Sequence, residues 1–340
     1  MVAPPADMAE KTGKTKPLGE FALIERYFAP LSKSQPLAFG LTDDVAFLKP
    51  RKGRDLVITK DVVVAGVHFL NSDSPDLVAR KALRVNLSDL AAKGAKPLGY
   101  LLGAVLPKRV DPAWLERFAA GLAEDQKEFG VSLLGGDTVS TPGPLTLSIT
   151  ALGDVPAGVY LRRSGAKVGD DIYVTGAIGD AALGLGLVQG KIDLRNKSLR
   201  ARLVGRYRLP EPRLGIGPGL LKIASACLDV SDGLVADLGH ICETSGLAAE
   251  IQAEAVPLSA AARSLLKDHP RLLNRLLTGG DDYELLFTAA PGNARRAAAL
   301  AKSTGVAVTR IGRMMTGSGV RVLGRAGKPL TISHGGFTHF

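Results

Sequence analysis

The chain has 340 residues, of which 46% are hydrophobic and 22% are charged, and its formal net charge is +10. The composition is that of an ordinary globular protein, and the length favours two domains over a single large one. No apolar run approaches the ~20 residues that a membrane-spanning helix needs, which argues against an integral membrane protein.

The N-terminal segment, residues 1–17, is polar, and we expect it to form a disordered tail. It lacks the apolar core of a secretory signal. The two cysteines, Cys227 and Cys242, form neither a metal-binding spacing nor a disulfide framework. Together these features favour a reducing cytoplasm as the location of the protein.

Strand and helix signals alternate in the first half of the chain. The clearest helix start is Ser74 as N-cap with Pro75 at the first helical position, and this helix is expected to end at Gly94. Asn86 and Asp89 lie three residues apart and share one of its faces, away from its apolar stripe. The other predicted elements are a helix at Glu20–Phe28, strands at Val45–Leu48, Leu56–Thr59 and Leu98–Leu106, a helix from Asp111 to about Phe129, and strands at Val131–Leu134 and Leu145–Leu152.

The second half repeats this alternation after residues 153–168, which we interpret as the passage between two domains. The predicted elements are a strand at Asp171–Thr175, a helix from about Asp180, helices near 198–206 and 213–226, a strand, loop and helix from Asp229 to Ile241, and strands at Leu285–Thr288 and Val306–Ile311 around an alanine-rich helix. Such alternation indicates α/β or α+β layering. We therefore expect an N-terminal domain at residues 18–153 and a C-terminal domain at residues 154–340.

The positive charge is densest between Lys191 and Arg213. This stretch lacks the interleaved aromatic residues of a single-strand binder, and no nucleic-acid motif accompanies it. We interpret it as a solvated helix face and loop, and we expect no nucleic-acid partner. A basic anion- or nucleic-acid-binding protein is the non-enzymatic alternative, which a strongly salt-dependent affinity for DNA without ATP binding would support.

Aspartates recur where a β-rich run meets a turn or a helix, and most of them have a glycine, serine or threonine beside them. The six similar frames are G-L-T-D-D with Asp43 and Asp44, T-K-D-V-V-V with Asp61, N-L-S-D-L-A with Asp89, G-G-D-T with Asp137, D-V-S-D-G-L with Asp229 and Asp232, and G-G-D-D-Y-E-L with Asp281 and Asp282. Hard cations such as Mg²⁺, and the phosphates they bind, require oxygen donors of this kind. The frames therefore predict a site for metal ions and phosphate.

Each aspartate taken alone has an ordinary structural explanation. Asp44 or Asp282 could be a turn residue. Asp89 could be a helix-surface acid, and Asp232 could cap the helix that follows it. Six turn or cap residues in such similar frames are improbable by chance, which favours the functional interpretation of the set.

The familiar nucleotide-binding fingerprints are absent from the sequence. There is no G-x-x-x-x-G-K-[ST] loop, no kinase-type catalytic loop, and no Rossmann G-x-G-x-x-G where a strand meets a helix. A nucleotide would instead be held through metal ions that bridge carboxylates to its phosphates. Ser231 is interpreted as a hydroxyl donor to phosphate or as a turn residue, and His68 as a ligand contact or a partly buried histidine.

Taken in order, these segments resemble the thiamine-monophosphate kinase family over nearly the whole chain. The resemblance is carried by G-E-F-A-L-I-E-R-Y-F (19–28), T-D-D-V-A-F-L (42–48), T-K-D-V-V-V-A-G-V-H-F-L (59–70), N-L-S-D-L-A-A-K-G-A (86–95), G-G-D-T (135–138), R-S-G-A-K-V-G-D (163–170), D-V-S-D-G-L (229–234), G-G-D-D-Y-E-L (279–285) and the closing G-G-F-T-H-F. Relatives in the wider superfamily that use sulfur or selenium chemistry need a reactive cysteine near one end, and this chain has none there.

The resemblance implies a two-domain aminoimidazole ribonucleotide synthetase-like fold, whose N-terminal domain binds ATP and Mg²⁺ and forms a homodimer through its strands. It also implies ATP-dependent, in-line transfer of the γ-phosphoryl group to thiamine monophosphate, the last step of thiamine diphosphate biosynthesis. A phosphate acceptor is largely dianionic at neutral pH, so no general base is expected.

The resemblance further assigns roles to individual residues. Metal ions are assigned to Asp44, Thr59, Asp61, Asp89, Asp137, Asp229 and Asp232. ATP contacts are assigned to Gly136, Asp137, Arg163 and Ser231, and thiamine phosphate contacts to His68, Asp281 and Phe337. Asp89, Asp137 and Arg163 are expected to be catalytic, with Arg163 as a fixed positive charge on the transferring group.

Two positions depart from the family pattern. Lys60 stands where many members carry a small hydroxyl residue, and a protonated lysine cannot ligate Mg²⁺, so we expect a phosphate contact there instead. Asp281 stands where glutamate is common, which shortens the side chain by one methylene. Asp43 and Asp282 receive no role.

Overall fold

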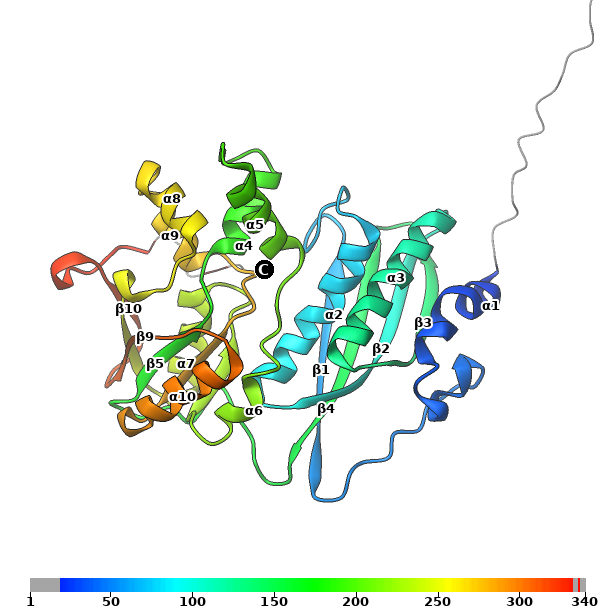
Figure 1. Cartoon of the computed structure of the whole chain (residues 1–340), viewed down its shortest axis with the longest axis horizontal. Helices are drawn as coiled ribbons and strands as arrows, with labels where there is room; N and C mark the ends of the chain where they lie inside the picture. The colour runs from blue at the N-terminus through cyan, green and yellow to red at the C-terminus, as the bar shows by residue number, and fades with distance from the viewer. Residues whose placement is uncertain (1–18, 333–335, 337–340) are drawn as a thin grey trace, which may run out of the picture.

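Two β-sheets, each packed against helices, form the two halves of the molecule (Figure 1). The structure is a computed structural model that describes residues 19–332 and residue 336. The first sheet has four strands in the order β1-β4-β2-β3, and the second has six in the order β10-β7-β9-β5-β8-β6. This layering confirms the expected α/β class with two units. The predicted tail at residues 1–17 lies outside the described residues.

The helices and strands have the following bounds. The first half contains α1 (Glu20–Leu23), a π-helical turn (Ile24–Phe28), 3-10 turns (Ala29–Ser32 and Pro36–Leu41), β1 (Arg54–Val64), α2 (Pro75–Ala92), β2 (Lys96–Pro107), α3 (Pro112–Phe129), β3 (Leu133–Thr141) and β4 (Thr146–Pro156). The second half contains β5 (Asp171–Thr175), α4 (Asp180–Val188), α5 (Lys197–Arg208), α6 (Gly217–Leu220), β6 (Ala226–Asp229), α7 (Leu234–Ser245), β7 (Ala248–Gln252), α8 (Ala260–Asp268), α9 (Leu272–Thr278), β8 (Leu285–Ala289), α10 (Ala294–Thr304), β9 (Val308–Met315) and β10 (Gly319–Leu323).

Helices α2 and α3 cover one face of the first sheet, whose other face is open (Figure 1). Because side chains alternate along a strand, every second residue of β1 turns away from the helices. On that open face Leu56, Ile58 and Val62 are 41%, 64% and 44% exposed. The covered face holds the first hydrophobic core, in which each fully buried leucine contributes roughly 1.5–3 kcal/mol of transfer free energy.

The second sheet is covered on both faces. Its strands β5, β6 and β8 are buried at every residue, with α7 on one side and α6 and α10 on the other. The last turn of α2 also packs, through Ala91 and Ala92, into the hydrophobic core between the second sheet and helices α6 and α10. Gly217 of α6 permits that contact, because a Cβ there would lie 2.3 Å from the carbonyl oxygen of Ala91. Helix α2 therefore lies between the two sheets.

Helix boundaries that depend on local chemistry are where the sequence predicts them. Helix α2 begins at Pro75, although the Ser74 side chain makes no capping hydrogen bond. The carboxylate of Asp111 accepts from the N–H of Ala113 at 2.9 Å, at the start of α3. Helix α3 ends at Gly130, whose φ of 66° is left-handed and suits glycine. No helix in the described part of the chain is long and apolar enough to cross a membrane.

The predicted strand at Val45–Leu48 is wrong. This segment forms no ladder; it runs beside the 3-10 turn Pro36–Leu41, where the N–H of Phe47 donates to the carbonyl of Leu37 at 3.0 Å. The side chains of Val45 and Phe47 are exposed. Its alternating apolar residues thus have no sheet to cover within one chain.

The predicted helix at 213–226 is mostly wrong as well. Only Gly217–Leu220 is helical. Glycines at 215, 217 and 219 and a proline at 218 disfavour a longer helix. The apolar residues of this segment recur at a helix-like spacing because Ile216, Leu220 and Ile223 are buried against the second sheet. Strands β7 and β10 and helices α8 and α9 have no counterpart among the predicted elements.

Candidate active site

Thr59, Asp61 and Asp89 meet between β1 and α2. Thr59 and Asp61 are two residues apart on β1, so both turn to the face that α2 covers. The hydroxyl of Thr59 donates to the carboxylate of Asp89 (Oγ1 to Oδ2, 2.5 Å). The N–H of Asp61 donates to the side-chain oxygen of Asn86 at 3.0 Å. Asn86 and Asp89 therefore do share the face of α2 that the sequence predicts for them.

Asp229 joins this group from the second half of the chain. It ends β6, and its carboxylate accepts from the hydroxyl of Ser88 at 2.6 Å. Burial, and then the charge of Asp89, raise the pKa of Asp229 to about 8. The same two causes raise the pKa of Asp61 to about 6. Because Asp89 acts on both, the three carboxylates lie near one another; together with Thr59 they are here termed the acidic cluster.

The acidic cluster gathers more negative charge than the neighbouring cations balance. Lys93 lowers the pKa of Asp229, but burial and the charge of Asp89 act more strongly on that pKa. The Lys93 ammonium donates to the carbonyl of Cys227 at 3.0 Å. Carboxylate and hydroxyl oxygens are the donors that Mg²⁺ prefers, and a divalent cation relieves the repulsion that raises such pKa values. The donor set therefore fits Mg²⁺.

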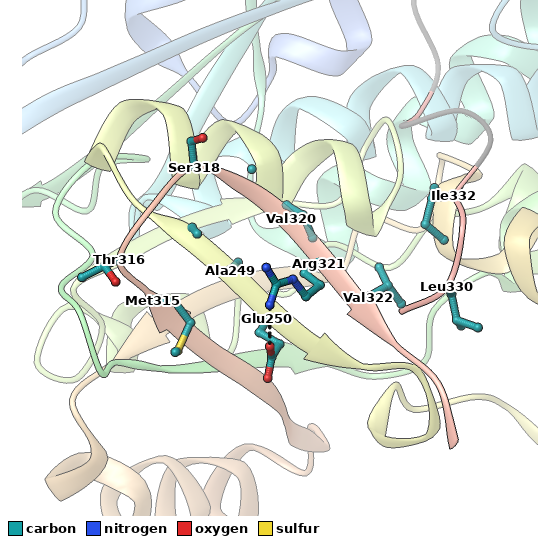
Figure 2. A pocket seen from close by; sticks show the side chains of 12 residues that line it. Ala249, Glu250, Met315, Thr316, Ser318, Val320, Arg321, Val322, Leu330 and Ile332 are labelled. Carbon is teal, nitrogen blue, oxygen red and sulfur yellow. Dashed lines mark ion pairs between the residues drawn. The ribbon is translucent and has the colours of Figure 1, made fainter. Parts of the chain in front are cut away.

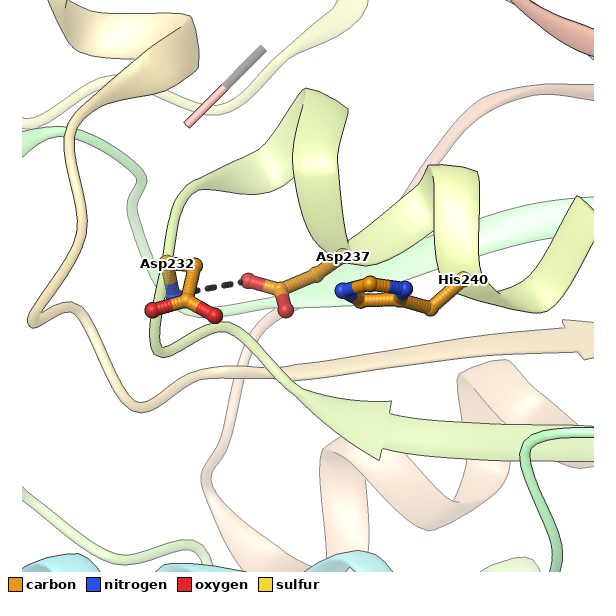
Figure 3. Close-up of side chains that lie close together, drawn as sticks. All are labelled: Asp232, Asp237 and His240. Atoms are coloured by element: carbon orange, nitrogen blue, oxygen red, sulfur yellow. Dashed lines mark hydrogen bonds between the residues drawn. The ribbon is translucent and has the colours of Figure 1, made fainter. Parts of the chain in front are cut away.

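Asp232 lies in a second group, in the loop between β6 and α7 (Figure 3). Its carboxylate faces Asp237 and His240, and one ligand atom from each lies within 4.8 Å of the others. The start of α7 is capped by Asp237 rather than by Asp232. The carboxylate of Asp237 accepts from the N–H groups of Asp232 and Gly233, both at 3.0 Å.

Asp137 and Asp44 do not meet the acidic cluster within one chain. Asp137 lies on β3, at the opposite edge of the first sheet from β1. Residues paired across β3, β2, β4 and β1 share a face, and this pairing places Asp137 on the side of Val62, the open face. Asp61 is on the covered face. Asp44 is exposed in the irregular segment before β1.

The other predicted ATP contacts are dispersed. A Cβ at Gly136 would lie 1.9 Å from the carbonyl oxygen of Leu102, so the close approach of β2 and β3 requires glycine there. Arg163 is exposed in the passage between the halves, and its side chain has no partner within 19–332 or at 336. Ser231 is half-buried directly after β6.

Several cations that the sequence singles out are engaged inside the chain. Lys60 points to the open face, where its ammonium donates to the hydroxyl of Ser148 at 2.5 Å, on the opposite side of β1 from Asp61. In the basic stretch, Arg208 binds Asp73 of the first half (Nε to Oδ1, 2.7 Å). The positive charge of this stretch is thus partly used to join the two halves.

The predicted substrate contacts His68 and Asp281 lie on loops of different halves. His68 Nδ1 accepts from the N–H of Val64 at 3.0 Å, which places the proton of the neutral ring on Nε2. Asp281 has a φ of 73°, which non-glycine residues rarely adopt. Its carboxylate pairs with Lys81 at 3.0 Å. Phe337 lies outside the described residues.

Asp282, which the sequence leaves without a role, fastens the Asp281 loop to α4. Its carboxylate accepts from the N–H of Gly179 at 2.6 Å and from that of Ala181 at 3.2 Å. These groups open α4, where the helix dipole favours a negative charge. The side chain is completely buried. Its role is therefore structural.

Glu284 is a buried acid that the sequence interpretation misses. It accepts from the hydroxyl of Thr175 at 2.7 Å, from Arg213 Nε at 2.6 Å and from Arg206 Nη2 at 3.1 Å. A charged residue directly before the apolar strand L-L-F-T-A is the signal that could reveal it, because a buried charge in such a place needs partners. Lys81, in the middle of α2, is a second buried charge that the sequence interpretation misses.

Two cavities lie outside the acidic cluster. One of about 390 Å³ adjoins the His68 loop and is lined by Phe69, Val78 and Trp114 with the polar residues Asp73 and Arg109 among others. Figure 2 shows the other, of about 460 Å³, beside β7 and β10. It lies at the edge of the second sheet opposite β6, away from the acidic cluster.

Comparison with known proteins yields matches along most of the chain. Residues 42–155 match the AIR synthase related protein, N-terminal domain, and residues 167–324 match the C-terminal domain. The thiamine-monophosphate kinase of Caulobacter vibrioides is 46% identical over 95% of this chain and 91% of its own length. The crystal structure of thiamine-monophosphate kinase from Stenotrophomonas maltophilia K279a is 41% identical, with a TM-score of 0.81 over 92% of this chain and 98% of that one. The structure of AaThiL complexed with AMPPCP and TMP is 30% identical, with a TM-score of 0.76 over 96% and 100%.

Proposed function

The chain belongs to the AIR synthase related family and, within it, to the thiamine-monophosphate kinases, and we propose that it transfers the γ-phosphoryl group of ATP to thiamine monophosphate, giving thiamine diphosphate. The acidic cluster is the observation that carries this proposal. It brings carboxylates from β1, α2 and β6 near one another between the two halves, as a polyphosphate site requires. Because ATP is the co-substrate, we also infer a cytoplasmic location.

The chemistry of this transfer needs alignment more than proton removal. The acceptor is a phosphate whose second pKa is about 6, so it attacks without a general base. Thr59, Asp61, Asp89 and Asp229 are proposed to hold Mg²⁺ together, and Asp44, Asp137 and Asp232, which lie outside the acidic cluster within one chain, are proposed as further metal ligands. When bound, Mg²⁺ neutralises the charge of the two anions that must meet. The hydroxyls of Thr59 and Ser88 orient Asp89 and Asp229 in advance through the hydrogen bonds described above.

The remaining site residues are proposed to bind the two substrates. Arg163, whose side chain has no partner in the described part of the chain, is proposed to offer its guanidinium to the transferring phosphate beside Gly136 and Ser231. His68 is proposed to donate from Nε2–H to the phosphate of thiamine monophosphate. Asp281 is proposed to accept from the amino group of thiamine, and Phe337 to stack on one of its rings.

The open face of the first sheet supports a homodimer. Leu56, Ile58 and Val62 form an exposed apolar row on β1, and Val139 on β3 is 45% exposed on the same face. Lys60 interrupts this row, with its ammonium bound to Ser148, but exposed apolar side chains gathered on one sheet face are typical of protein–protein contacts. Pairing two copies through this face would bury the row. It would also place Asp137 at the boundary between copies. Within one chain Asp137 does not reach the acidic cluster, but at this boundary its carboxylate can contribute to a site that two copies form together.

An Ile58→Lys variant is expected to dissociate the dimer, because it places a charge at the centre of the proposed interface. Sedimentation velocity at micromolar concentration should show a dimer for the wild type and a monomer for the variant. Met315→Lys, at an exposed apolar position on β9 in the second half, should remain dimeric. A monomeric wild type would rule the homodimer out.

The test of the function is direct. Purified protein incubated with ATP, Mg²⁺ and thiamine monophosphate should form thiamine diphosphate and ADP in equal amounts, and chelation of Mg²⁺ should stop the reaction. Free thiamine should not be a substrate, because it lacks the phosphate that attacks. Absence of product, or equal use of free thiamine, would count against the proposal.

A further inference from the structure

Lys81 lies on the buried face of α2, with a side chain that is only 5% exposed. An ammonium group in such a place is costly unless it is paired. Its Nζ donates to the Asp281 carboxylate and to the carbonyl oxygen of His68, each at 3.0 Å. The same atom lies 4.2 Å from the centre of the Tyr207 ring, a cation–π contact. One buried cation therefore touches both loops that carry the predicted substrate contacts.

We propose that Lys81 is a positioning residue for thiamine monophosphate, which it serves by holding the loops of His68 and Asp281 in a fixed relation. This inference rests on the proposed function, which assigns both residues to the substrate. His68 belongs to the first half of the chain and Asp281 to the second, so neither sheet alone sets their separation. Helix α2 lies between the halves, and Lys81 is the side chain on it that binds both.

The backbone on the Asp281 side is already fixed. The N–H of Asp281 donates to the carbonyl of Ser231, and the N–H of Tyr283 to that of Val230, both at 2.8 Å. Asp281 and Tyr283 hold φ values of 73° and 52°, and such strain persists only where surrounding contacts enforce it. The Asp281 carboxylate interacts with the side chain of Tyr283 in its own loop, and Lys81 holds it from across the boundary between the halves.

The His68 side is a tight turn that closes on itself. The N–H of His68 donates to the carbonyl of Val64, and the N–H of Val64 donates back to His68 Nδ1, both at 3.0 Å. The ring is therefore locked to the backbone of its own turn. Because Lys81 binds the carbonyl of His68, it sets the orientation of that backbone and, through it, of the imidazole.

A general role in joining the halves would be a different explanation, and the chain contains a matched control for it. Arg208 also joins the halves, through its 2.7 Å pair with the buried Asp73. This pair touches neither His68 nor Asp281. Asp73 also accepts from the N–H of Leu70 at 2.9 Å in the His68 loop, and this bond does not need Arg208, so loss of Arg208 should weaken the association of the halves while the loop keeps its own contacts.

The test compares Lys81→Met with Arg208→Met in the full chain. For Lys81→Met we expect the KM for thiamine monophosphate, and its Kd measured by calorimetry without ATP, to rise roughly 10–100-fold. The KM for ATP should change by less than about 3-fold. Arg208→Met should leave both constants for thiamine monophosphate within about 3-fold, even where it lowers the melting temperature. If Lys81→Met does not fold, Lys81→Gln, which keeps a donor but loses the charge, takes its place.

A double-mutant cycle decides whether Lys81 acts through Asp281. In an Asp281→Asn background, Lys81→Met should weaken binding by a clearly smaller factor than in the wild type, because one of the two groups that it positions is already altered and only the His68 contact remains to be lost. Equal affinity of wild type and Lys81→Met, or equal losses in both backgrounds, would overturn the inference. A wild type that binds thiamine monophosphate without phosphorylating it would refute the proposed function instead and leave the calorimetric comparison valid.

Discussion

Replacing Asp89 with asparagine is expected to abolish kinase activity, with kcat reduced by about 10³-fold or more and the fold retained. Asparagine keeps the shape of the side chain and can still accept from the hydroxyl of Thr59, so the packing of β1 against α2 survives. It removes the negative charge that lies between Asp61 and Asp229 and that Mg²⁺ binding requires. Steady-state kinetics with saturating ATP and thiamine monophosphate measure the loss.

Asp76→Asn is the matched control for Asp89→Asn. Asp76 lies in the first turn of the same helix and pairs with the exposed Arg117, far from the acidic cluster along α2. An exposed pair of this kind contributes at most about 1 kcal/mol, and activity should be unchanged. If Asp89→Asn keeps normal turnover, the assignment of the helix acid to the metal site is wrong.

The stability of the metal-free protein separates loss of chemistry from loss of fold. The raised pKa values of Asp61 and Asp229, about 6 and about 8, mean that the folded chain binds more protons than the unfolded chain above the ordinary value of 3.8. The contribution of these groups to the free energy of unfolding therefore falls as pH rises, until it levels off above about pH 8. Asp89→Asn removes one cause of both shifts and should weaken this fall. Thermal melts between about pH 6 and pH 9 without Mg²⁺ measure it, and a variant much less stable than wild type would indicate unfolding.

Glu284→Gln is expected to give the largest loss of stability, about 3–5 kcal/mol. Glu284 is 1% exposed and neutralises Arg206 and Arg213, whose side chains are 11% and 17% exposed. Glutamine has one accepting oxygen in place of two and turns an amide N–H₂ toward guanidinium donors, so two buried cations lose their counter-ion. The midpoint of urea unfolding measures the effect. Activity should fall too, because Glu284 supports the loop of Asp281.

Glu211→Gln provides the control, since Glu211 pairs with the same two arginines from the surface. Its side chain is 56% exposed, so water screens the pairs and the expected loss is below about 1 kcal/mol. Equal destabilisation by Glu211→Gln and Glu284→Gln would mean that burial does not decide the strength of these pairs.

Features that depend on a few neighbouring residues could be predicted from the sequence alone. Pro75 starts α2, Asp111 caps α3, and Gly130 ends it, because each acts on its own backbone or on that of the next residues. The same locality explains why Asn86 and Asp89 were correctly placed on one face of α2. Predictions based on apolar period alone were weaker. The alternation at Val45–Leu48 corresponds to no strand in one chain.

The candidate site shows a similar division. Aspartates in glycine- and serine-rich frames, in the order that the family shares, are sufficient to predict metal, phosphate and the kinase family. The sequence does not reveal that Asp61, Asp89 and Asp229 converge, because they come from a strand, a helix and a second sheet. It also does not reveal that Asp137 points to the open face, because the pairing of four strands decides the side on which a residue lies.

The residues that support the site are the ones that only the tertiary structure identifies. Lys81 and Asp281 are 200 positions apart, and Glu284 lies 71 and 78 positions from the arginines that it binds. A lysine within a helix or a glutamate before a strand has no local signature of its partner. Short sequence motifs are enough to predict the kind of reaction. The contacts that hold the site residues in place depend instead on which buried charges the packing of α2 and the two sheets brings together.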